Sequence, residues 1–239
     1  MQGTIRLFKF AGIQVYLHFS WFIVAAYQLT QRLNNYESQI FAVYEYLALF
    51  GIVLLHEFGH SLACRQVGGS ADHIVLWPLG GIAFVDPPRR PGAVLWSIAA
   101  GPLVNVALIP VIELLWIFAG QSGWRHDSPD LFQLIGMIRF INYGLLIFNL
   151  LPVYPLDGGQ VLRALLWFPF GEIRSLQIAS VVGLVGGAAL AVLALLSWSI
   201  WTGILAFFIL SRAIAGWQYA KAMVAEKKAA EAPPMMPRV

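Results

Sequence analysis

Six apolar runs constrain the fold of this 239-residue chain more than any motif does. A helix needs about 20 mostly apolar residues to cross the hydrocarbon core of a bilayer. We therefore predict spans over Ile13–Leu29, Ile40–Cys64, Ala93–Ala119, Leu131–Leu151, Leu176–Leu196 and Trp198–Trp217. Charged residues make up 11% of the chain, against about 25% in soluble domains, and the mean hydropathy is +0.72. The sequence predicts an all-α polytopic membrane protein in a lipid bilayer.

The second apolar run contains the sequence His56-Glu57-Phe58-Gly59-His60. Residues four apart lie on one face of a helix, so the two imidazoles can bind one metal ion with Glu57 beside them. Placing an ionisable side chain inside a membrane span costs free energy, so such a residue is interpreted as functional unless another role is shown. The run therefore predicts two metal ligands and a general base.

A non-spanning segment, residues 70–86, follows the second run. Two stretches rich in β-branched and aromatic residues flank Gly80 and Gly81, which predicts a β-hairpin with its turn at these glycines. Pro78 confines the first strand to an edge or to its last residues. We expect a small membrane-associated hairpin between the second and third spans.

The fourth run ends in a segment that holds Asn149, Pro152, Pro155 and Asp157. Two prolines three residues apart break helical hydrogen bonding. Broken backbone at membrane depth is tolerated only against protein or a wet cavity, so a site is expected here.

The basic residues predict the orientation in the membrane. If the N-terminus is cytoplasmic, twelve basic residues fall on the cytoplasmic side and two, Arg32 and Arg125, on the other. This bias predicts cytoplasmic termini, with the HEFGH motif and Asp157 near the same cytoplasmic depth, and we expect the plasma (inner) membrane. The basic residues stand mostly singly at the ends of apolar runs, so we expect no nucleic-acid partner.

A catalytic zinc ion usually has three protein ligands, so His56 and His60 need one more. Cys64 continues their helical face, but eight residues of helix rise about 12 Å, too far for one zinc ion. His73 and His126 lie in predicted loops, and His126 is on the opposite side. Asp157 has suitable chemistry, and Gly158 and Gly159 allow close backbone approach.

Four motifs in order resemble the site-2 protease family of intramembrane zinc metalloproteases, over about residues 48–163. They are HEFGH, the PLGG hairpin, Gly101-Pro102-x-x-Asn105 and Asn149-x-x-Pro152-x-x-Pro155-Leu156-Asp157-Gly158. The resemblance implies one Zn²⁺ per chain held by His56, His60 and Asp157, with Glu57 as catalytic acid and base. It also implies cleavage of a membrane protein's transmembrane segment near the cytoplasmic face. Asn105, Asn149, Gly80 and Gly81 fall at other motif positions and suggest substrate positioning or, for the asparagines, ligand support.

From these observations we expect four parts: an N-terminal span and link (1–39), a three-span catalytic core (40–165), two further spans (166–220) and a disordered cytoplasmic tail (221–239). The chain departs from some members of the family, because no inserted PDZ-type domain and no C-terminal nucleotide-sensing (CBS) domain is expected. We further hypothesise that the hairpin edge holds an unwound substrate segment as an added strand.

Two alternatives remain open. The first is a membrane scaffold of the same fold that binds zinc without catalysis, against which the intact Glu57 argues. The second is an ion transporter, which would predict interrupted helices in two repeated halves, whereas only one break is found. For Glu113, Arg139 and Glu45 we expect structural roles, with Glu113 and Arg139 as a pair or at the interface.

Overall fold

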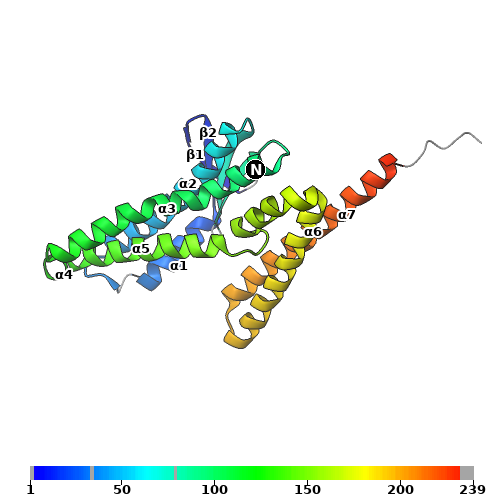
Figure 1. Ribbon diagram of the computed structural model, residues 1–239. Coiled ribbons are helices and arrows are strands. Elements are labelled where there is room, and N and C mark those ends of the chain that lie inside the picture. Colours follow the sequence, from blue (N-terminus) through cyan, green and yellow to red (C-terminus); the bar gives the residue numbers. More distant parts are fainter. Residues whose placement is uncertain (1–2, 33–34, 78–79, 232–239) are drawn as a thin grey trace, which may run out of the picture. The chain divides into compact units, whose positions relative to one another are not determined.

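The computed structural model describes residues 3–32, 35–77 and 80–231. Contacts divide the chain into two compact units, Met1–Leu150 and Leu151–Val239 (Figure 1). Five helices in the described part of the chain are long and apolar enough to span a membrane.

The first unit is built on three long helices: α2 (Ile40–Gln66), α3 (Pro91–Gln121) and α5 (Pro129–Leu150). They confirm the predicted second, third and fourth spans to within a few residues. Pro91 opens α3, where its missing N–H costs no helical hydrogen bond. The short helix α4 (Trp124–Asp127) lies in the link between α3 and α5.

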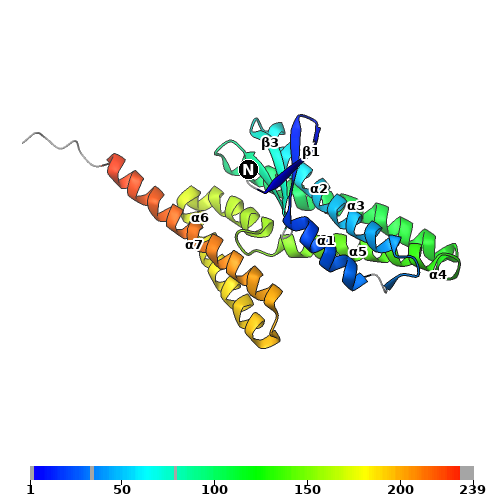
Figure 2. The same cartoon turned by 180° about the vertical axis from the view of Figure 1, so that it is seen from behind.

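A four-stranded sheet completes the first unit, in the order β1-β2-β3-β4. The strands are β1 (Thr4–Phe10), β2 (Ile13–His18), β3 (Ser70–Trp77) and β4 (Gly80–Asp86). β2 runs parallel to β3, and the two other pairs are antiparallel. In both views the sheet lies at one end of α2, α3 and α5, and α4 lies at the other (Figure 2).

The sheet packs through its apolar face on the part of α2 that carries the HEFGH motif. Ile13 and Val15 of β2 and Ile74 of β3 form a buried cluster with Val53 and Phe58 of α2. Residues two apart on one strand share a face, so Ile13 and Val15 both point toward the helix. The part of α2 around the HEFGH motif is thereby packed against the sheet.

Arg65, near the C-terminal end of α2, adds polar contacts to this packing. Its guanidinium group donates to the backbone carbonyls of Ala11 and Gly12 in the β1–β2 turn and of Ala71 in β3. One side chain therefore joins the end of α2 to the N-terminal hairpin and to β3.

The predicted first span, Ile13–Leu29, is wrong as a single helix. Residues 13–18 form β2, and α1 (Ser20–Arg32) follows with 13 residues. Such a helix is about 20 Å long, shorter than the roughly 30 Å hydrocarbon core. The alternation of Ile13, Val15 and Leu17 suits a strand, and pairing with β3 satisfies its backbone.

The predicted hairpin over residues 70–86 is confirmed as β3 and β4, but its turn is not at the glycines. Gly80 pairs with Trp77 and Gly81 with Leu76, so both glycines belong to β4. The intervening residues, Pro78 and Leu79, lie outside the described part of the chain. The hairpin is also half of a larger sheet, because β2 pairs with β3.

The second unit consists of two long helices, α6 (Asp157–Ser197) and α7 (Ile200–Glu231). α6 bends at Gly171, whose φ of 78° lies in the left-handed region. A Cβ at Gly187 would lie 2.8 Å from the Leu210 side chain, so this glycine permits close packing of the two helices. Residues 151–156 precede α6 and are not helical, which confirms the predicted break.

The predicted disordered tail is wrong for residues 221–231, because α7 continues to Glu231. This stretch is rich in Ala, Lys and Glu, which have high helix propensity, and it extends a helix that is already formed. The rest of the predicted tail, residues 232–239, lies outside the described residues.

Candidate metal centre

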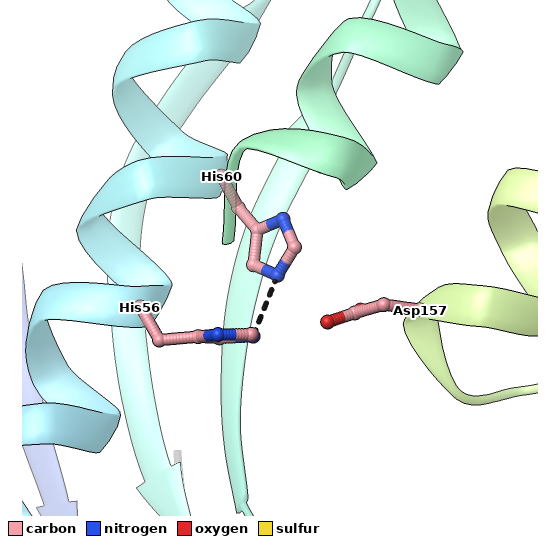
Figure 3. A group of neighbouring side chains, drawn as sticks. All are labelled: His56, His60 and Asp157. Carbon is pink, nitrogen blue, oxygen red and sulfur yellow. Dashed lines mark hydrogen bonds between the residues drawn. The ribbon is translucent and has the colours of Figure 1, made fainter. Parts of the chain in front are cut away.

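Two histidines in the C-terminal half of α2 have buried side chains that face each other. The side chains of His56 and His60 are both 5% exposed, and their Nε2 atoms lie 3.1 Å apart (Figure 3). One helical turn separates the residues, so both rings leave the same face of α2. The two ring planes are almost perpendicular, at 83°.

The opposite ring nitrogen of each histidine contacts an oxygen. His60 Nδ1 lies 2.9 Å from the backbone carbonyl of Ser97, and His56 Nδ1 lies 2.7 Å from Oδ1 of Asn105. Neither oxygen can donate, so each Nδ1 carries the proton and donates it. In a neutral ring Nε2 is then an unprotonated acceptor.

Two unprotonated nitrogens 3.1 Å apart repel each other unless a cation lies between them. A metal ion placed between them satisfies both lone pairs. For zinc–nitrogen bonds of about 2.05 Å and tetrahedral geometry, the two nitrogens lie about 3.3 Å apart. The spacing and the Nδ1 contacts therefore fit a zinc ion.

Two glycines let α3 pass close to this pair. A Cβ at Gly101 would collide with the His60 ring and lie 2.8 Å from His56 Nε2. A Cβ at Gly59 would lie 2.7 Å from the backbone oxygen of Ala100. Gly59 thus sets the approach of the two helices, and Gly101 leaves room beside the two Nε2 atoms.

Glu57 lies beside the histidines and contacts the sheet. Its side chain is buried, and Oε2 accepts a hydrogen bond of 2.9 Å from the backbone N–H of Ala83 in β4. A carboxylate in this position can accept a proton from a neighbouring group and donate it again.

The structure places the other predicted site residues as follows. Asn105 contacts His56 directly, while Asn149 is half-buried in the last turn of α5. Gly80 and Gly81 lie in β4, and Asp157 is the first residue of α6 in the second unit. Cys64 is buried and donates to the backbone oxygen of Ser70, as suits a packing residue.

The predicted structural roles of the remaining charged residues agree with their contacts. Arg139 Nε lies 2.6 Å from Glu113 Oε1, which confirms the expected pair between α3 and α5. Glu45 is buried and accepts a hydrogen bond from the Tyr36 hydroxyl, with Arg32 Nε 3.3 Å away.

Sequence reasoning missed two groups next to the histidines, Ser97 and Asn142. Ser97 contacts His60 through its backbone carbonyl. Because every residue has this group, the residue type gives no indication of the contact. Asn142 is buried in α5 and hydrogen-bonds with Asn105. Its signal was available, because an amide side chain within an apolar span needs a partner.

Comparison with known proteins places the chain in a family. Residues 117–193 match peptidase family M50. A zinc metalloprotease of Methanocaldococcus jannaschii is 33% identical over 183 residues, which are 77% of this chain and 51% of that protein. Stage IV sporulation protein FB of Bacillus subtilis is 30% identical over 70% of this chain and 53% of that protein. The chain spans about half the length of these two curated relatives.

A solved structure extends the likeness to the whole fold. The site-2 protease from Methanocaldococcus jannaschii is 30% identical and superposes with a TM-score of 0.63, over 90% of this chain and 95% of that one. Within the residues that the structure describes, this chain has five helices long and apolar enough to span a bilayer, as expected for an integral, multi-pass membrane protein. The chain belongs to the site-2 protease family of zinc metalloproteases, peptidase family M50.

Proposed function

We propose that this protein is a zinc-dependent endopeptidase that hydrolyses peptide bonds in or near the transmembrane segments of membrane proteins. The observation that carries the proposal is the pair of Nδ1-anchored histidines, with Nε2 atoms 3.1 Å apart on an apolar helix beside Glu57. Each ring is already oriented for a metal ion before one binds. The names of the relatives support the same reaction class.

We propose Asp157 as the third ligand, so that two imidazoles and one carboxylate hold one Zn²⁺. Three protein ligands with an open fourth position are typical of catalytic zinc sites. Asp157 follows the broken segment 151–156 directly, where the backbone is not constrained by helical geometry.

Zinc at this site would polarise the scissile carbonyl and lower the pKa of the attacking water to about 7. Glu57 then takes the proton from that water and passes it to the leaving amine. Burial of Glu57 excludes bulk water from the carboxylate, and the Ala83 N–H orients one of its two oxygens. Nδ1 of each histidine stays bound to its acceptor throughout.

The scissile carbonyl of a helical substrate accepts a hydrogen bond within the substrate's own helix. The substrate helix therefore has to unwind locally before cleavage. We propose that the unwound segment pairs with the outer edge of β4, the last strand in the order of the described sheet. The contact between Glu57 and Ala83 supports this position, because a segment on that edge would run beside the proposed base.

We also propose a site near the cytoplasmic face, both termini in the cytoplasm and the plasma membrane as location. The support is the distribution of basic residues, twelve against two. His56 and His60 lie in the C-terminal half of α2, which is the half near the cytoplasm in this orientation.

The proposal is tested with detergent-purified parent, Asp157→Ala and Glu57→Gln proteins. We expect about one zinc per chain in the parent and marked loss in Asp157→Ala. Glu57→Gln should keep its zinc but fail to cleave reporters, each a single transmembrane helix with Gly and Pro near its cytoplasmic end. Equal cleavage by Glu57→Gln and parent would overturn the catalytic role. Zinc binding with no cleavage by any protein of the set would favour the non-catalytic scaffold.

A further inference from the structure

The hydrogen bonds behind His56 continue to a third residue and end on the backbone. Asn142 of α5 is 1% exposed, and its Nδ2 donates to the backbone oxygen of Asn105 at 3.0 Å. Its Oδ1 accepts from Nδ2 of Asn105 at 2.9 Å. Oδ1 of Asn105 in turn lies 2.7 Å from His56 Nδ1.

Only one assignment of donors and acceptors is consistent with this series of hydrogen bonds. A backbone carbonyl cannot donate, so Asn142 must direct its NH₂ group to it and its oxygen toward Asn105. Asn105 must then direct its own NH₂ group to Asn142 and its oxygen to His56. The proton of His56 is thereby placed on Nδ1, and Nε2 is left as the metal-binding nitrogen.

Asn105 alone would not fix this arrangement. The two ends of an amide are nearly equal in shape, so without Asn142 the group can turn over and direct its NH₂ to His56 Nδ1. His56 would then carry its proton on Nε2, the nitrogen needed for the metal. His60 has no such ambiguity, because its partner is the backbone carbonyl of Ser97.

We propose that Asn142 is a positioning residue for metal binding, which selects the tautomer of His56 by fixing the side-chain amide of Asn105. The proposal rests on the zinc site proposed above. Loss of an outer hydrogen-bonding partner of a metal-binding histidine typically lowers metal affinity 10- to 100-fold. Asn142→Leu, which neither donates nor accepts, should weaken zinc binding about tenfold.

One substitution separates positioning from packing. Asn105→Asp has two equivalent oxygens and needs no orientation. In the Asn105→Asp background, Asn142→Leu should therefore lower zinc affinity by less than about threefold, whereas loss of packing between α3 and α5 would act equally in both backgrounds.

Tyr143→Phe is the matched control. The Tyr143 hydroxyl donates to Glu113, so this variant also removes one hydrogen bond between α5 and α3, one residue further along α5. Its zinc affinity should equal that of the parent.

Zinc affinity is measured on detergent-purified proteins by competition with a chromophoric chelator. ¹⁵N NMR of the metal-free proteins with labelled histidine, assigned with a His56→Gln variant, reports which ring nitrogen carries the proton. We expect Nδ1–H at His56 in the parent and Nε2–H in Asn142→Leu. Asn142→Ala replaces Asn142→Leu if the latter does not fold.

Unchanged zinc affinity and an unchanged tautomer in Asn142→Leu, or an equal loss in Tyr143→Phe, would overturn the proposal. A parent protein that binds no zinc would instead overturn the proposed function. The two failures are distinguishable, because only the second appears before any change at Asn142.

Discussion

The carboxylate of Glu57 accepts a hydrogen bond from the backbone N–H of Ala83, so the HEFGH helix and the last strand of the sheet meet at one atom pair. The bond joins α2 to β4, and residues 57 and 83 are brought together by the packing of the sheet on this helix. It gives the proposed base a fixed orientation before substrate binds.

Ala83→Pro removes the N–H that Glu57 accepts. A hydrogen bond to a charged group contributes about 1.5–3 kcal/mol, so we expect at least a tenfold lower cleavage rate with unchanged zinc content. Ala83→Gly keeps the N–H and is the control. Equal rates in the two variants would show that the bond does not contribute to catalysis.

Gly101→Ala places a methyl group against the His60 ring and close to His56 Nε2. Because real side chains do not approach so closely, a ring or the helix must move, and zinc affinity should fall by at least tenfold. Gly92→Ala lies on the same helix in open space and should bind zinc like the parent. Chelator competition measures both, and retained affinity in Gly101→Ala would contradict the described site.

Removal of the metal should lower the thermal stability of the parent. A ligand that binds only the folded state at 100 times its dissociation constant stabilises it by about 2.7 kcal/mol. The unfolding temperature should therefore drop by several degrees after chelation and recover with added zinc. His60→Ala should show no response to either treatment; a response equal to that of the parent would place the metal elsewhere.

Gly159→Ala tests the backbone that carries the proposed third ligand. A Cβ at this position would collide with the backbone of Val153 and lie 2.6 Å from the Cα of Tyr154. The broken segment must then shift, and we expect reduced zinc content with α6 still helical by circular dichroism. Gly144→Ala, in an open position of α5, is the control and should retain zinc. Parent-like zinc content in Gly159→Ala would argue against Asp157 as a ligand.

Three of the long helices were predictable because each rests on a local signal, whereas α6 begins at Asp157 rather than at the predicted Leu176. α2, α3 and α5 begin and end within a few residues of the predicted spans, since hydropathy and proline positions determine them. The pair of Arg139 and Glu113 was also predictable, because two opposite charges inside apolar helices need each other.

The sheet was only half predictable, because β2 depends on a partner about 60 residues away. Val15 pairs with Ile74 in a parallel register that no local pattern encodes. An average of hydropathy over residues 13–29 cannot distinguish one spanning helix from a strand followed by a short helix. The positions of His56 and His60 followed from helical spacing, whereas the contact of Asn142 with Asn105 depends on how α3 and α5 pack.

The parallel pairing of β2 with β3 has a consequence for how the gene is read and how the protein is produced. The first eighteen residues precede every recognised motif, and a translation start assigned after His18 would still encode all of them. The resulting protein would lack β1 and β2, and with them the buried Ile13 and Val15 that cover the motif helix. Affinity tags therefore belong at the C-terminal end, and a start site should be accepted only if it keeps the N-terminal hairpin.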